Sequence, residues 1–292
     1  MTADAAIEDK LEQAVADLHR PGGPAILHEA IRYSVFPGGA RVRPQLCLAV
    51  EQACENAQSV CASGAAAALE LLHCASLVHD DLPCFDDASL RRGKPSVHCV
   101  FGEPIAVLAG DAMIIAAFKV LANVYAFERG DAVLFARLHD ILTDAIGAPD
   151  GIIAGQAWES EKFVDLRAYH RSKTGAMFVA AAKAGAVCAG DDPASWSALG
   201  ERLGEAYQIA DDLRDYLLDA AALGKPAGQD ARCSRPNAVE TLGEEGARDQ
   251  LQELIRDAED AVPDCAGAEA LRTLVRSQAR RLMSACATKR VA

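Results

Sequence analysis

Aromatic and basic residues are both scarce in this 292-residue chain. Phe, Trp and Tyr make up 5% of it, and 29 Lys and Arg stand against 42 Asp and Glu, for a formal net charge of −13 at pH 7. The acidic excess argues against a nucleic-acid-binding surface and against attraction to anionic lipid, because both require a basic face. It is compatible with the binding of divalent cations.

Cysteine pairs with metal-binding or redox spacing are also absent. The ten cysteines are scattered, none forms a Cys-x-x-Cys pair, and they are interpreted as reduced, mostly buried thiols. Residues 1–15 lack a basic start followed by an apolar run, so no secretory signal is expected. The most apolar segment, 104–127, contains Asp111 and Lys119, which are costly in lipid. We therefore expect no stable membrane anchoring and a cytoplasmic location.

No alternating pattern long enough for a strand occurs, whereas apolar residues recur every three or four positions throughout the chain. The pattern predicts an all-α fold. Breakers such as RPGGP at 20–24 separate the helices, but none is long enough to be an interdomain linker, so we expect a single domain over residues 1–292. The predicted helices are 5–19, 25–36, 43–56, 61–82, 104–127, 131–146, 149–161, 165–189, 193–219, 246–261 and 267–286.

Two acidic clusters carry the strongest chemical signal. In HDDLPCFDD the first cluster is Asp80, Asp81, Asp86 and Asp87, and Pro83 is expected to end the helix that carries its first pair. Alone, this cluster could equally be a solvated acidic loop.

The second cluster, in YQIADDLRDYLLD, contains Asp211, Asp212 and Asp215. Asp211 and Asp215 are one turn apart on a mostly apolar helix, and a buried helix does not gather three acids without a counter-charge. Two such clusters converging on one cavity predict a Mg²⁺ site, since Mg²⁺ takes one or two carboxylates per ion and substrate phosphate oxygens.

Basic residues beside these clusters indicate that the phosphate-bearing substrate is a diphosphate, because arginine binds phosphate through two parallel donors and lysine as a point charge. They are Arg91, Arg92, Lys94, Lys173 and Lys225. The alternative is that these cations merely balance surface acids. Calcium-loop, P-loop and His-Glu-x-x-His patterns do not match, and an HD-type metal phosphohydrolase would leave the second cluster unexplained.

From about residue 25 to 285 the chain resembles the trans-isoprenyl diphosphate synthases, or polyprenyl synthetases. Asp80-Asp81-x4-Asp86 with the following RRGKP resembles their first aspartate-rich motif, and Asp211-Asp212-x2-Asp215 their second. The further matching blocks, in the family's order, are GGARVRP at 38–44, LLHCASLVHDD at 71–81, GQAWE at 155–159, KTG at 173–175 and GKPAGQD at 224–230.

This resemblance implies a helical bundle around a deep central cavity (the isoprenoid synthase fold), a homodimer, and Mg²⁺ as cofactor, with three ions when substrate is bound. The substrates would be isopentenyl diphosphate and an allylic diphosphate, namely dimethylallyl, geranyl or farnesyl diphosphate. By matched position the metal-facing acids would be Asp80, Asp81, Asp86, Asp211, Asp212 and Asp215. The allylic diphosphate would be held by Arg91, Lys173 and Lys225, the homoallylic one by Arg43, His73 and Arg92, and the reaction centre would be lined by Thr174 and Gln208.

Family chemistry explains these residue types. Ionisation of the allylic carbon–oxygen bond creates a carbocation and a highly charged leaving group, which metal and lysine stabilise. The cation must then meet isopentenyl diphosphate before water, so the cavity must be dry. The departing diphosphate is expected to accept the final proton.

The sequence departs from the family pattern at four positions. Ala40 stands where a lysine that binds isopentenyl diphosphate is common, so Arg41 or Arg43 must compensate. Arg235 and Asn237 replace the usual lysine and threonine, and Glu159 replaces aspartate. Arg235 keeps the charge and is included among the substrate-binding residues.

Product length is predicted from the residues one turn before Asp80, since one isoprene unit of about 5 Å roughly matches one helical turn. Ala75 and Ser76 stand there and are small, whereas farnesyl synthases of the family commonly carry an aromatic residue. The expected product is geranylgeranyl diphosphate, as in bacterial members that serve carotenoid or bacteriochlorophyll pathways. Close helix packing is the alternative explanation of these small residues.

Three other functions share part of this pattern. A farnesyl diphosphate synthase would share all the chemistry. A terpene cyclase would share the fold but usually lacks the second aspartate motif. A non-catalytic subunit that modulates a partner synthase is disfavoured because all six matched aspartates are retained.

Overall fold

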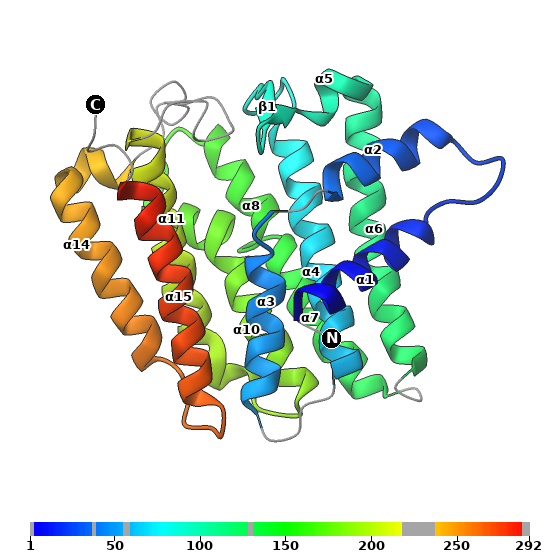
Figure 1. The fold of residues 1–292 in the computed structure, drawn as a ribbon. Helices are drawn as coiled ribbons and strands as arrows, with labels where there is room; N and C mark the ends of the chain where they lie inside the picture. The colour runs from blue at the N-terminus through cyan, green and yellow to red at the C-terminus, as the bar shows by residue number, and fades with distance from the viewer. Residues whose placement is uncertain (1–2, 37–38, 55–58, 128–130, 218–236, 288–292) are drawn as a thin grey trace.

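The computed structural model describes residues 3–36, 39–54, 59–127, 131–217 and 237–287. Long helices lie side by side, and a small antiparallel hairpin lies at one end of the bundle (Figure 1). The prediction of an all-α fold is confirmed. The helices are α1 (Ala3–Ala16), α2 (Ala25–Val35), α3 (Val42–Ala53), α4 (Ser59–Asp80), α5 (Val97–Phe101), α6 (Glu103–Phe127), α7 (Ala132–Ile146), α8 (Ile152–Ala157), α9 (Leu166–His170), α10 (Ala176–Cys188), α11 (Ser197–Leu217), α14 (Ala238–Asp260) and α15 (Ala268–Ala287); the strands are β1 (Leu90–Arg91) and β2 (Lys94–Pro95).

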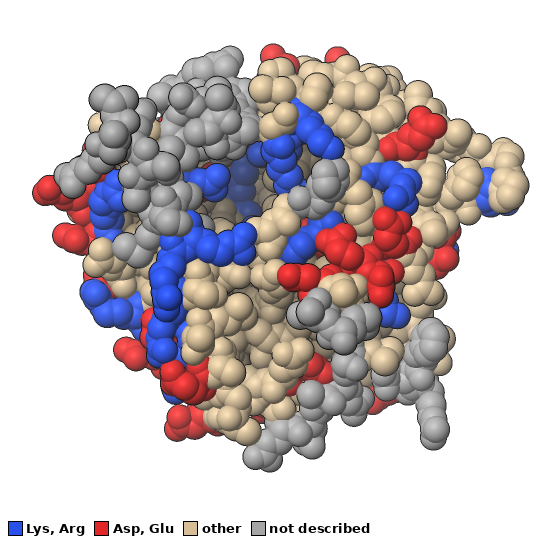
Figure 2. Space-filling view, viewed as in Figure 1, with Lys and Arg blue, Asp and Glu red and all other residues tan. Residues whose placement is uncertain are grey.

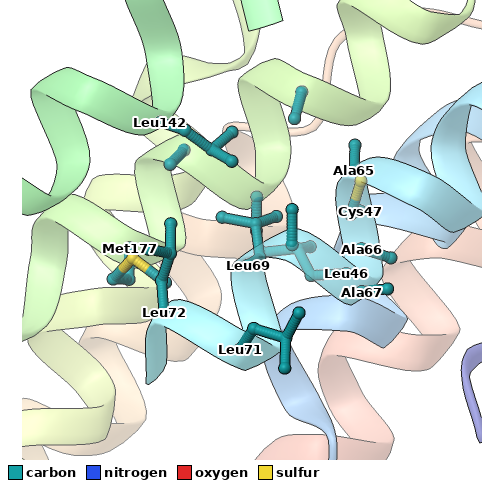
Figure 3. Close-up of a cluster of buried hydrophobic side chains, with 14 of the residues drawn as sticks. Leu46, Cys47, Ala65, Ala66, Ala67, Leu69, Leu71, Leu72, Leu142 and Met177 are labelled. Atoms are coloured by element: carbon teal, nitrogen blue, oxygen red, sulfur yellow. The ribbon is translucent and has the colours of Figure 1, made fainter. Parts of the chain in front are cut away.

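Helix α4 is the centre of the main core and packs against α1, α3, α6 and α10. Its alanines allow close helix contacts, while Leu69 and Leu72 fill the space towards α7 and α10, beside Leu142 and Met177 (Figure 3). At Gly64 a Cβ atom would lie within 2.3 Å of Val124, so α6 approaches the backbone of α4 there. Small residues and leucines thus build a core that needs few aromatic side chains.

A second, smaller core joins α11, α14 and α15. Leu213 on α11 is fully buried, and Leu251 and Leu254 of α14 belong to the same cluster. Because α11 also packs against α10, this helix is held on both sides. The second acidic cluster is therefore carried by a rigidly packed element.

Most predicted helices are found within a few residues of their expected ends, but two predictions were wrong in detail. The helix predicted at 149–161 covers only Ile152–Ala157 and continues as one 3₁₀ turn, η1 (Trp158–Ser160). The helix predicted to begin at 246 begins at Ala238, because the Asn237 side chain accepts a hydrogen bond from the Val239 amide. Gly243, at φ 72°, kinks this helix. A glycine inside a helical pattern indicates a helix boundary in the sequence, so the helix was predicted to begin after it.

Within the described residues, two helical segments are long and apolar enough to span a membrane by length and composition, Val60–Asp80 and Glu103–Val124. The first is 78% buried in its most apolar window, as expected of a core helix, and the second is 44% buried. The second exposes apolar side chains such as Leu108 (51% exposed) and Ile115 (67% exposed). The core position of α4 accounts for its hydropathy, whereas α6 keeps an uncovered apolar face.

Candidate active site

Both acidic clusters lie at the carboxyl ends of helices. Helix α4 ends at Asp80, before Pro83 as predicted, and α11 ends at Leu217, two residues after Asp215. The carboxyl end of a helix is the negative end of its dipole and disfavours further negative charge. Carboxylates at two such ends therefore favour cations in the space between them.

A π-helical turn, η2 (Arg171–Gly175), connects the two clusters. Lys173 Nζ lies 3.3 Å from Asp80 Oδ1, and the hydroxyl of Thr174 donates a 2.8 Å hydrogen bond to Gln208 on α11. Since Lys173 and Thr174 are neighbours, the first cluster and the helix of the second lie on either side of one turn. The sequence predicted that these groups converge; the π-helical conformation was not predicted.

Asp80 lies among several charged side chains. Burial raises the pKa of this carboxyl; Lys173 and Arg91 lower it, while Asp86 and Glu159 raise it. Asp86 is buried, and its backbone amide donates to the carbonyl oxygen of Asp80. Lys173 and Arg91 offset only part of the unfavourable burial and crowding, since the pKa of Asp80 stays raised, so a further cation would stabilise the pair of carboxylates.

Asp81 differs from its neighbour because Arg91, on β1, binds it at close range. Arg91 Nε lies 2.9 Å and 3.2 Å from the two carboxylate oxygens of Asp81, which is 2% exposed. Burial raises the pKa of Asp81 and the guanidinium partly offsets the rise. Asp81 therefore holds the hairpin residue Arg91 at the edge of the site.

Glu159 anchors Lys173 and is a contact that the sequence did not reveal. Its carboxylate contacts Lys173 Nζ and accepts hydrogen bonds from Tyr169 at 2.8 Å and Gln156 at 3.1 Å. The GQAWE block marked this segment, but only the fold shows that its glutamate reaches the lysine.

The three acids of the second cluster have different surroundings. Asp211 has a half-exposed side chain, with Arg214 at 4.0 Å. Asp212 is 1% exposed and accepts hydrogen bonds from Gln208 and from the Ala238 amide. Asp215 is buried, and its Oδ1 has no hydrogen-bond partner among the described residues.

Arg43, His73 and Arg92 form the basic group expected for the second diphosphate. Arg43 Nη1 lies 3.4 Å from His73 Nε2, and the guanidinium of Arg92 lies so close to Gly39 that a Cβ there would be 2.8 Å away. Burial lowers the pKa of His73 well below its usual value, and Arg43 and Arg92 lower it further. These effects favour the neutral form of His73.

Arg41 lies apart from this group. It is 6% exposed, and its guanidinium binds Glu70 at 2.7 Å, Glu8 at 2.8 Å and the carbonyl oxygen of Val35 at 2.9 Å. The structure thus does not place Arg41 where it could replace the lysine missing at exposed Ala40. Of the two arginines considered for that role, Arg43 has the better position. Lys225 and Arg235 lie outside the described residues.

The two residues expected to set product length lie on α4 below Asp80. Ala75 is 1% exposed, and Ser76 is half-buried with its hydroxyl donating to the His73 carbonyl. Near the upper ends of the helices the surface in Figure 2 is hollowed, and Lys and Arg atoms gather along the walls of the hollow. This positive lining suits an anionic ligand.

Comparisons with known proteins agree with this geometry. The family model described as "Polyprenyl synthetase" matches residues 24–271. The chain is 50% identical over 283 residues to a geranylgeranyl diphosphate synthase of Rhodobacter capsulatus, and the aligned region covers 97% of each chain. Similar solved structures include an FPP/GFPP synthase of Zymomonas mobilis (TM-score 0.79, 29% identity, 95% of this chain and 97% of that one) and a geranyltransferase of Helicobacter pylori with magnesium and isoprenyl diphosphate (TM-score 0.76, 28% identity, 97% of each).

Proposed function

Since the chain belongs to the polyprenyl synthetase family, we propose that it is a trans-prenyltransferase that condenses isopentenyl diphosphate with allylic diphosphates to give geranylgeranyl diphosphate. The observation that carries the chemistry is the π-helical turn, whose Lys173 contacts Asp80 and whose Thr174 contacts Gln208. The product assignment is supported by the relative from Rhodobacter capsulatus and by the small Ala75.

The residues fit a magnesium site. Among the described residues no three His, Cys, Asp or Glu side chains form a metal-binding group by themselves, so diphosphate oxygens and water would supply further ligands. The crowded Asp80 and Asp86, the half-exposed Asp211 and the unpartnered oxygen of Asp215 are the candidate ligands. Bound Mg²⁺ would stabilise the charge that develops on the leaving diphosphate. We propose three ions with substrate bound.

The basic residues would divide between two diphosphates. Lys173 and Arg91 lie beside Asp80, on the allylic side, and Lys225 is proposed to join them. Arg43, neutral His73 and Arg92 would hold isopentenyl diphosphate on the other side. Two separate groups of cations would keep the substrates in a fixed orientation. In well-oriented reactions, fixed orientation lowers the activation barrier by about 7 to 11 kcal/mol.

Reaction-centre roles are proposed for polar groups without net charge. The oxygen atoms of Thr174 and Gln208 lie next to Lys173 and would stabilise the allylic cation once the diphosphate leaves. The prenyl chain would extend along α4 past Ser76 and Ala75, which are both small. Bond formation leaves a cation on the isopentenyl unit, and the released diphosphate would take a proton from the adjacent carbon, so that the new double bond forms.

The whole chain is proposed to act as one cytoplasmic domain over residues 1–292 and as a homodimer. The apolar face of α6, with Leu108 and Ile115 exposed, supports a partner subunit, since large exposed apolar patches mark contact surfaces.

The testing experiment combines purified protein, Mg²⁺, labelled isopentenyl diphosphate and, in separate tubes, dimethylallyl, geranyl or farnesyl diphosphate, with products dephosphorylated and sized. A twenty-carbon product that disappears with EDTA is expected. A fifteen-carbon product would retain the chemistry and overturn the product assignment. The absence of product from every primer would instead favour a non-catalytic subunit.

A further inference from the structure

Asp212 takes part in a hydrogen-bonded relay that begins at the reaction centre. The Thr174 hydroxyl donates to Gln208 Oε1, Gln208 Nε2 donates to Asp212 Oδ1, and the Ala238 amide donates to Asp212 Oδ2, each at 2.8 Å. The relay thus runs from η2 through α11 to the first residue of α14.

The surroundings of Asp212 differ from those of Asp211, one position earlier. The Asp211 side chain is 49% exposed, whereas Asp212 is 1% exposed and both of its oxygens accept hydrogen bonds from protein. Adjacent residues on a helix point about 100° apart, so the two carboxylates face different surroundings. A metal ion at Asp212 would have to reach a buried oxygen that already accepts a hydrogen bond, and would compete with that bond.

We propose that Asp212 is a positioning residue and not a metal ligand, and that it fixes the direction of hydrogen bonding so that Thr174 turns its oxygen lone pairs towards the reacting carbon. The proposal deepens the proposed prenyltransferase function and rests on it.

The direction follows from the donors and acceptors available. A carboxylate carries no hydrogen, so Asp212 accepts at both oxygens and Gln208 must present its NH₂ group to it. The amide oxygen of Gln208 then faces Thr174, and the threonine hydroxyl must donate its hydrogen to that oxygen. The lone pairs of the hydroxyl oxygen stay available to a developing positive charge, and the hydroxyl hydrogen points away from it.

Asp212→Asn reverses this direction without a large change in shape. The introduced asparagine would accept from the Ala238 amide with its oxygen and present its NH₂ group to Gln208, whose amide would turn over. Gln208 would then donate to Thr174, and the threonine hydrogen would be released towards the cavity. We expect kcat to fall about 100-fold, at the lower end of the loss seen when one preorganised dipole is removed, with KM for both substrates within threefold of wild type.

The double variant Gln208→Glu with Asp212→Asn restores the original direction. The introduced glutamate can accept from both Thr174 and the introduced asparagine, which still accepts from Ala238, and the net charge of the pair is unchanged. We expect kcat to recover at least tenfold over Asp212→Asn. Gln208→Glu alone places two carboxylates in contact and should recover nothing.

The experiment measures steady-state kinetics at saturating Mg²⁺, the thermal unfolding of each variant, and calorimetric binding of Mg²⁺ together with inorganic diphosphate. Asp212→Asn should leave that binding within threefold of wild type, whereas Asp211→Asn should weaken it. Weakened binding in Asp212→Asn, or a folded double variant no faster than the single one, would overturn the proposal. Failure of wild type to form any prenyl product would refute the proposed function instead, so the two failures are distinguishable.

Discussion

At the scale of single residues, the six matched aspartates have unequal surroundings. Asp81 is held by Arg91 and Asp212 by Gln208 and a backbone amide, whereas Asp80 contacts Lys173 and the Asp211 side chain is half exposed. Substitutions of these aspartates should therefore differ in their effects, because some would remove a proposed metal ligand and others a contact that positions a neighbouring side chain.

Asp80→Ala and Asp211→Ala should each lower kcat by at least about 10²-fold, because each removes a charge from the proposed metal site. Steady-state prenyl transfer over a range of Mg²⁺ concentrations measures the effect. Asp140→Asn on α7, whose side chain is 79% exposed, is the control and should behave as wild type. Near-normal turnover in either alanine variant would contradict the two-cluster mechanism.

Ala75→Tyr should shorten the main product from twenty to fifteen carbons, since the ring would enter the space proposed for the growing chain. Sizing of dephosphorylated products made from dimethylallyl diphosphate checks this, with Ala75→Ser as the control that keeps the twenty-carbon product. A folded tyrosine variant that still makes twenty carbons would place the limit elsewhere.

His170 predicts a pH dependence of stability. Burial lowers the pKa of His170 to about 4, below the unfolded value of about 6.5. The unfolded state therefore binds a proton that the folded state does not, and stability falls as the pH drops through this window. His170 contributes about 2 to 3 kcal/mol of the loss at pH 4.5, and His73, whose pKa is also lowered, adds to it. Urea unfolding at pH 7 and 4.5 measures it; if His170→Gln loses as much stability as wild type, another group is responsible.

At the scale of elements, two glycines hold the π-helical turn in place. A Cβ at Gly155 of α8 would lie 2.5 Å from the Cα of Lys173, and one at Gly204 of α11 would lie 2.6 Å from the Cα of Gly175. The turn is thus packed backbone to backbone between two helices, which fixes the position of Lys173 and Thr174.

Gly204→Ala should therefore destabilise the fold by about 1 to 3 kcal/mol through overpacking, and should lower kcat because the turn must shift. Gly175→Ala is the matched control, since its Cβ would meet nothing closer than 3.8 Å and its φ is −64°. That control should gain up to about 1 kcal/mol. Denaturant unfolding and kcat for both variants test this, and equal behaviour would refute the packing argument.

At the scale of the whole molecule, the uncovered face of α6 is the feature to explain. Ile115→Arg should convert a dimer to a monomer, because a buried unpaired charge opposes association. Sedimentation velocity checks the state. Leu242→Arg, 46% exposed on α14 at the other side of the bundle in Figure 1, is the control that should leave assembly unchanged. A monomeric wild type would contradict the proposed homodimer.

Sequence periodicity predicted most of the helical elements because apolar residues recur at helical spacing, and because a proline or glycine often stands near a helix end. It failed where backbone geometry depends on neighbours. The π-helical turn at Lys173 and Thr174 exists between Gly155 and Gly204, which are distant in sequence. The early start of α14 depends on the N-cap residue Asn237, and the kink at Gly243 interrupts the apolar periodicity of this helix.

The sequence by itself determined the residue types of the site: two aspartate clusters at helix ends, the basic residues beside them, and the family to which they belong. These are local patterns, so spacing was enough. Only the tertiary structure decided which partner each charge has. Arg41 binds Glu70 and Glu8, and Lys173 binds Glu159. The Asp211 side chain is half exposed, whereas Asp212 is buried. The reason is physical: a hydrogen bond acts over about 3 Å, and residues far apart in sequence reach that distance only once the helices have packed.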